Sequence, residues 1–110
     1  MQFKATQTFA KAFKRLREKH RNLDVDIDTL RLTLMKNPSA GIPLGTGLYK
    51  IRLASSDMAK GKSGAFRVIY YLRLDASTIV LLDLYTKNEK ESVPISAIKK
   101  ILEQYLGEVG

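Results

Sequence analysis

The chain has 110 residues, 45% of them hydrophobic, with a formal net charge of +8 and an isoelectric point near 9.8. This length and composition predict one folded domain over residues 1–110 and exclude a disordered chain. The absence of cysteine excludes disulfides and thiolate chemistry and is compatible with a reducing cytoplasm, where we expect the protein. No apolar run reaches the roughly 18 residues of a membrane span, and no signal-peptide core is present at the N-terminus. The positive charge favours a polyanionic partner: RNA, DNA or an acidic protein.

The first half of the chain predicts a short strand followed by a helical hairpin. Residues 3–5 favour the strand, and Thr6 or Thr8 can cap the helix that follows it. Apolar residues then recur at helical spacing in two segments, and Asn37-Pro38 ends the second. The other face of the first helix is basic and would lie in solvent or steer an anionic partner. The apolar positions are Phe9, Phe13 and Leu16 in the first helix and Leu23, Ile27, Leu30 and Leu34 in the second.

Three acidic residues, Asp24, Asp26 and Asp28, stand at the start of the second helix. Carboxylates are favoured there because the helix dipole is positive at that end. The alternation also resembles the start of a calcium loop, but the glycine and the glutamate that complete such a ligand set do not follow. We therefore expect no metal site at these residues.

The second half of the chain predicts three strands and a final helix. A linker that contains glycine and proline, residues 39–47, precedes the strands, and residues 75–77 make a tight hairpin. The strands are expected at residues 48–53, 66–74 and 78–85. The final helix begins near Pro94. Its apolar side would consist of Ile98, Ile101, Leu102 and Tyr105. This order of elements predicts a single α+β domain.

Several familiar motifs are incomplete in this chain. Gly61-Lys62-Ser63 ends like a P-loop, but Ser56 stands where that motif needs glycine, and a strand follows in place of a helix. Gly45-Thr46-Gly47 precedes a strand instead of following one, so no dinucleotide site is expected. His20 is the only histidine, which excludes a catalytic pair of histidines and a site with several histidine ligands. We expect His20 on the basic surface of the first helix.

Cations gather on the predicted sheet and on the loop after its first long strand. Lys50 and Arg52 share one face because successive side chains of a strand alternate. Arginine binds phosphate oxygens through two parallel donors, and a lysine crowded by cations has a lowered pKa and can act as a general base. The cations could therefore stabilise a phosphate that gains charge in a transition state. The alternative is a basic strand edge that discourages aggregation. The cations are Lys50, Arg52, Lys60, Lys62, Arg67 and Lys87, with Tyr70 and Tyr85 nearby in sequence.

The chain resembles the RelE/ParE superfamily of toxins from type II toxin–antitoxin systems, and within it the HigB-like and RelE-like mRNA interferases. The resemblance rests on GTGLYKIRLAS, GKSGAFRVIYYL and LLDLYTKNEKE, in that order, after a two-helix half that ends in NPSAG. It implies a small twisted antiparallel sheet, with the helical hairpin packed on it and a C-terminal helix. It also implies cleavage of mRNA in the ribosomal A site by attack of the 2′-hydroxyl on the adjacent phosphate, without a metal or cofactor.

The resemblance also assigns roles to residues. Arg67 would stabilise the charge of the transition state, and Lys87 matches a lysine that follows the last strand of the family. Lys60 and Lys62 match loop lysines that contact RNA and supply the general base. Arg52, beside Lys50, matches the basic residue of KIR and would bind RNA. Tyr85 stands where an aromatic side chain supports the scissile nucleotide, with a packed strand residue as the alternative.

The sequence departs from the family pattern in the basic loop, which carries Asp57 and Met58, and at Ser63 and Ala65. The implied partners are the ribosome with its mRNA and a cognate antitoxin of the helix-turn-helix type. Two other functions stay open at this point. One is a ParE-like inhibitor of DNA gyrase, a group that lacks the basic catalytic set. The other is a non-enzymatic module that binds nucleic acid through its charge.

Overall fold

Five strands and three helices build the described part of the chain, which in this computed structural model comprises residues 1–57, 65–73, 75 and 77–109. The elements are β1 (Gln2–Ala5), α1 (Gln7–Arg17), α2 (Leu23–Lys36), β2 (Ile42–Gly45), β3 (Leu48–Ala54), β4 (Ala65–Leu72), β5 (Thr78–Thr86) and α3 (Ile95–Val109). The α+β class and the order of the predicted elements are confirmed. Among the described residues, no helix combines the length and apolarity needed to cross a membrane.

The strands form one sheet in the order β1-β5-β4-β3-β2. The pairs from β5 through β2 are antiparallel, as expected, but β1 runs parallel to β5, so the sheet is mixed. All nine residues of β5 are buried, because this strand has a neighbour on each side and helices on both faces. A register shift between Ile69 and Tyr70 interrupts the pairing of β4 with β5.

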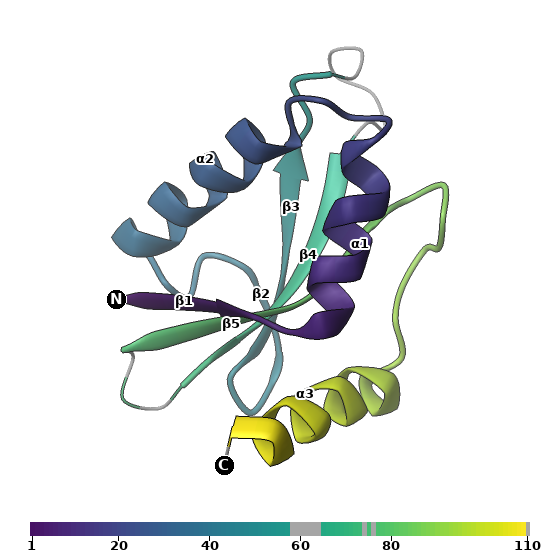
Figure 1. Cartoon of the computed structure of the whole chain (residues 1–110). Helices are drawn as coiled ribbons and strands as arrows, with labels where there is room; N and C mark the ends of the chain where they lie inside the picture. Colours follow the sequence, from purple (N-terminus) through teal and green to yellow (C-terminus); the bar gives the residue numbers. More distant parts are fainter. Residues whose placement is uncertain (58–64, 74, 76, 110) are drawn as a thin grey trace.

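Helices α1 and α2 cover one face of the sheet and enclose the larger core (Figure 1). The apolar stripes predicted from helical spacing are the buried ones: Phe9, Leu16, Leu30 and Leu34 have at most 4% of their surface exposed. They pack against strand residues such as Phe66, which is fully buried. The helical hairpin predicted for the first half of the chain is therefore the layer that supports the sheet from this side.

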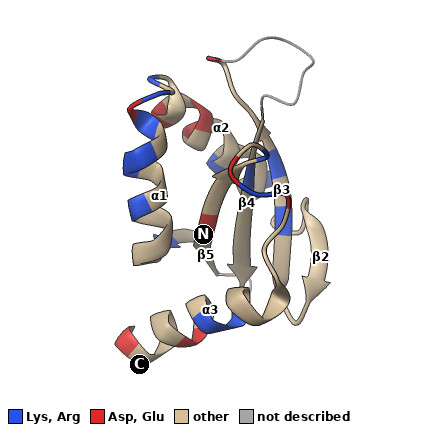
Figure 2. Cartoon of the chain, turned by 90° about the vertical axis from the view of Figure 1, so that its right-hand side faces the viewer, with Lys and Arg blue, Asp and Glu red and all other residues tan. Residues whose placement is uncertain are grey.

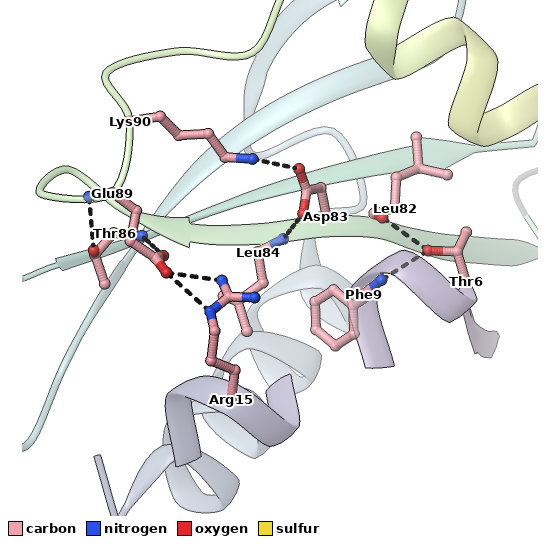
Figure 3. Close-up of polar contacts among 9 residues, drawn as sticks. All are labelled: Thr6, Phe9, Arg15, Leu82, Asp83, Leu84, Thr86, Glu89 and Lys90. Carbon is pink, nitrogen blue, oxygen red and sulfur yellow. Dashed lines mark hydrogen bonds and ion pairs between the residues drawn. The ribbon is translucent and has the colours of Figure 1, made fainter. Parts of the chain in front are cut away.

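Thr6 fixes the start of α1 to the sheet. Its hydroxyl accepts a hydrogen bond of 3.0 Å from the backbone N–H of Phe9, which is the capping interaction predicted for Thr6 or Thr8. The same hydroxyl donates a bond of 2.8 Å to the carbonyl of Leu82 in β5 (Figure 3). One buried side chain thus caps the helix and attaches it to β5.

Helix α3 lies against the opposite face, across one end of the sheet (Figure 1). Ile98 is 1% exposed and packs in a second core, which includes Leu48, Ile69 and Val80. The carbonyl of Pro94 accepts the first backbone bonds of the helix, so the helix begins where the proline predicted it. Because α3 lies across one end of the sheet, the rest of this face carries no helix among the described residues.

Strand β2 was not expected, since its residues fall in the segment predicted as a linker. Ile42–Gly45 pairs with β3 at the edge of the sheet, where Pro43 is tolerated because an edge strand leaves one side unpaired. The turn into β3 has positive φ at Gly45, Thr46 and Gly47. A Cβ on Gly47 would come within 2.8 Å of the carbonyl oxygen of Leu72, so only glycine fits there.

Candidate active site

Arg52, Arg67 and Tyr85 form a row across three adjacent strands. Arg52 of β3 is the direct partner of Arg67 of β4, and Arg67 is the partner of Tyr85 of β5. Direct partners in an antiparallel pair project to the same face of the sheet. The basic face predicted from the alternation in β3 therefore exists, and it continues onto β4.

Lys50 belongs to the same face, one row closer to α3, where its partner is Ile69 and the partner of Ile69 is Asp83. Lys50 and Arg67 are half-buried, whereas Arg52 is exposed. Arg52 lies four positions along β3 from Leu48, which packs near α3, so the two are about 13 Å apart. Figure 2 shows basic residues along β3, with α3 at the other end of the sheet. Helix α3 therefore lies away from Arg52, which is the exposed member of the row.

Tyr85, at the β5 end of this row, has no exposed surface. Within the described part of the chain, its hydroxyl is buried without a hydrogen-bond partner. Burial raises the pKa of this hydroxyl, the nearby charge of Arg67 lowers the pKa, and the carboxylate of Asp83 raises it further. A ring with no exposed surface offers no face to a nucleotide, so the geometry favours the packed strand residue over nucleotide support.

Asp83 and Lys90 add a charge pair that the sequence analysis did not single out. The Asp83 side chain is 6% exposed and accepts a bond of 2.8 Å from the N–H of Leu84. Its other oxygen lies 3.4 Å from Nζ of Lys90, which stands 5.2 Å from the centre of the Tyr85 ring (Figure 3). Lys90 reaches this face because the chain turns after β5. No periodicity in the sequence predicts that turn.

Lys87 is exposed in the turn that follows β5, one residue beyond the last pair with β4. Glu89 closes this turn, because its carboxylate accepts a bond of 3.0 Å from the N–H of Thr86. The same carboxylate accepts two bonds, of 3.1 and 2.8 Å, from Arg15 of α1. Burial by itself would raise the pKa of the Glu89 carboxyl, but the Thr86 N–H and the Arg15 guanidinium outweigh it and hold the pKa below its ordinary value.

The start of the basic loop is attached to the helical hairpin. Asp26, 6% exposed, accepts bonds of 3.2 and 3.0 Å from the N–H and the hydroxyl of Ser56. Asp57 accepts bonds of 2.7 and 3.0 Å from the backbone and side-chain nitrogens of Asn22. Asp26 therefore does more than interact with the helix dipole, and Asp57 has a structural partner.

Two of the predicted site lysines, Lys60 and Lys62, lie outside the described residues. Among the residues that are described, no three histidine, cysteine or acidic side chains come together as a metal site would require.

His20 differs from its expected place. It stands just beyond α1, is half-buried, and contacts Phe66 edge to face with ring centres 5.1 Å apart. The expectation of a basic helix surface was wrong, because the turn between α1 and α2 folds His20 back onto the start of β4. This position is on the helix-covered side of the sheet, and so His20 does not join the basic row.

No family model matches this chain. The structure is similar to that of a double mutant of the E. coli toxin RelE in the free state, with a TM-score of 0.57. The match covers 82% of this chain and 86% of that chain, at 16% sequence identity. The chain therefore has the RelE-like fold that its sequence motifs predicted.

Proposed function

We propose that this protein is a ribosome-dependent mRNA interferase, the toxin of a toxin–antitoxin pair that acts in the cytoplasm. The observation that carries the proposal is the cross-strand register of Arg52 and Arg67, on the sheet face opposite α1 and α2 of a RelE-like fold. Two arginine side chains from neighbouring strands can bind two consecutive phosphates, or one phosphate of high charge.

The reaction is a transfer within the RNA chain. The 2′-hydroxyl oxygen forms a bond to the adjacent phosphorus while the bond from phosphorus to the 5′-oxygen of the next nucleotide breaks. A general base takes the proton of the 2′-hydroxyl, and the 5′-oxygen leaves with a proton. The products are a 2′,3′-cyclic phosphate and a free 5′-hydroxyl, so atoms balance without water, metal or cofactor.

Each cation has a role in this proposal. Arg67, held on β4, stabilises the charge that gathers on the phosphate oxygens, and Lys87 acts from the neighbouring turn. Lys60 and Lys62 contact RNA, and one of them serves as the general base. Lys50 and Arg52 bind the RNA backbone. Tyr85, the cross-strand partner of Arg67, has a packing role.

The ribosome is required because the site has no histidine pair to arrange RNA unaided. Primer extension on a translated message tests this directly. The proposal expects cuts within or next to A-site codons and little cleavage of naked RNA. Intact mRNA together with trapped DNA gyrase would favour the ParE-like alternative, and intact mRNA with RNA binding alone would favour a non-enzymatic module.

Growth provides a second test, which also concerns the partner. Expression of the chain alone should stop bacterial growth and block translation, because nothing neutralises the toxin. Co-expression of a neighbouring antitoxin, expected to carry a helix-turn-helix, should restore growth. Normal growth at high expression of folded protein would contradict the proposal.

A further inference from the structure

The turn that carries Lys87 is closed from both ends by side chains. The N–H of Thr86 donates to Oε1 of Glu89, and the N–H of Glu89 donates to the hydroxyl of Thr86 at 3.3 Å. Backbone bonds from Glu89 and Lys90 to the carbonyl of Thr86 complete the turn. Lys87 therefore stands on a backbone whose conformation is set by its flanking residues.

This turn is also attached to α1. Oε2 of Glu89 accepts from both Nε and Nη2 of Arg15, at 3.1 and 2.8 Å (Figure 3). Helix α1 is in turn fixed to β5 through Thr6 and Leu82. The Glu89 carboxylate uses one oxygen to close the turn and the other to join it to a helix that is itself attached to β5.

We propose that Glu89 and Arg15 are positioning residues that hold Lys87 for its contact with the scissile phosphate. This inference rests on the proposed function and adds two residues that do not touch RNA. A shift of about 1 Å in a reacting group can reduce a rate about 10²-fold, so a fixed turn matters more for turnover than for affinity. The α1 cation Arg15 thus acts through the geometry of the turn.

The test measures kcat and KM for mRNA cleavage on programmed ribosomes, with a thermal melt of each variant. Glu89→Ala should lower kcat about tenfold and change KM by less than about twofold. Glu89→Gln keeps an acceptor for the Thr86 N–H but loses the charge, and should lower kcat by only about threefold. Arg15→Ala leaves the bonds between Thr86 and Glu89 in place, and it tests the same claim if Glu89→Ala fails to fold.

Arg17→Ala is the matched control. Arg17 is also an α1 arginine in an ion pair, at 3.0 Å from Asp24, and its side chain is 55% exposed against 56% for Arg15. Arg17→Ala removes the same charge from the same helix as Arg15→Ala, but Arg17 makes no contact with the turn in the described structure. The kcat of Arg17→Ala should therefore stay at the wild-type value.

A double substitution separates positioning from a general loss of structure. If Glu89 acts through Lys87, Glu89→Ala should lower kcat no further when Lys87 is already alanine. A full tenfold additional loss in that background, or an unchanged kcat for Glu89→Ala alone, would overturn the positioning role while the proposed function stands. A wild-type chain that cuts no mRNA on ribosomes would overturn the proposed function and the positioning role with it.

Discussion

Arg52 and Arg67 are direct partners in the antiparallel register of β3 and β4, so their side chains project to the same face of the sheet. Like charges placed directly opposite each other disfavour a strand pair. A phosphate bound between them would offset this repulsion. If the proposed site binds a phosphate here, the stability of the sheet should depend on that ligand.

Inorganic phosphate should stabilise the folded chain through this pair. A ligand present at about ten times its Kd adds about 1.4 kcal/mol, or roughly 6 °C in Tm for a domain of this size. Thermal melts with phosphate, against chloride of equal ionic strength, measure the effect. In Arg67→Ala the added stabilisation should shrink by more than half. An equal rise in Tm for the wild type and Arg67→Ala would mean that phosphate binds at another place on the protein.

Asp26 should contribute far more to the free energy of unfolding than Asp28, which lies two residues further along α2. Asp26→Ala removes a buried carboxylate that accepts two bonds from Ser56, and should lower the free energy of unfolding by about 2 kcal/mol. Asp28 is the control: its side chain is 71% exposed and pairs with Arg31 at 3.5 Å, so Asp28→Ala should stay within about 0.5 kcal/mol. Denaturant unfolding of both variants compares them, and similar losses would contradict a stabilising role for the bonds between Asp26 and Ser56.

Tyr85 should matter through its ring and not through its hydroxyl. Tyr85→Phe removes a buried oxygen that lacks a partner in the described structure, so unfolding free energy should stay equal or rise by up to about 1 kcal/mol. Tyr85→Ala should lower it by about 3–5 kcal/mol, because it empties a core position. Cleavage by Tyr85→Phe should match the wild type. A 10²-fold loss in a folded Tyr85→Phe would place the hydroxyl in the chemistry.

Sequence patterns predicted the fold where a periodic apolar stripe meets a clear stop signal. The stripes of α1 and α2, the end of α2 at Asn37 and the start of α3 after Pro94 are of this kind. Strand β2 was missed, because its only signal is two apolar residues beside a proline, and pairing with β3 makes it a strand. The parallel direction of β1 depends on which strand it pairs with, and the local sequence pattern does not contain that information.

The candidate site was predictable to the extent that it follows strand alternation. Lys50 and Arg52 share a face as expected, because side chains of a strand alternate, and the pairing of β4 with β3 brings Arg67 to the same face. The contacts of Glu89 and Lys90 depend on the turn after β5, and residues 74 positions apart meet when Arg15 contacts Glu89. Such long-range pairs leave no trace in a single sequence.

Acid should weaken the fold through Glu89. Its pKa is lowered in the folded chain, so its carboxylate stabilises the fold above its ordinary pKa of 4.5, and that contribution is lost as the pH falls through the lower folded value. The stability difference between the wild type and Glu89→Gln should therefore shrink as the pH falls from about 7 to about 3. Thermal melts across this range check the prediction. A difference that stays constant or grows on acidification would contradict it.

The most direct measurement of the central claim is the rate of mRNA cleavage on programmed ribosomes by Arg67→Ala and Lys14→Ala, with a thermal melt of each. Both variants remove one cation from a chain of net charge +8, so generic affinity for polyanions should change little in either. If Arg67 stabilises the transition state, Arg67→Ala should cut about 10²-fold more slowly, whereas Lys14→Ala should alter only ribosome affinity and its salt dependence. Equal small losses in two folded variants would contradict the catalytic assignment and leave only a basic binding surface.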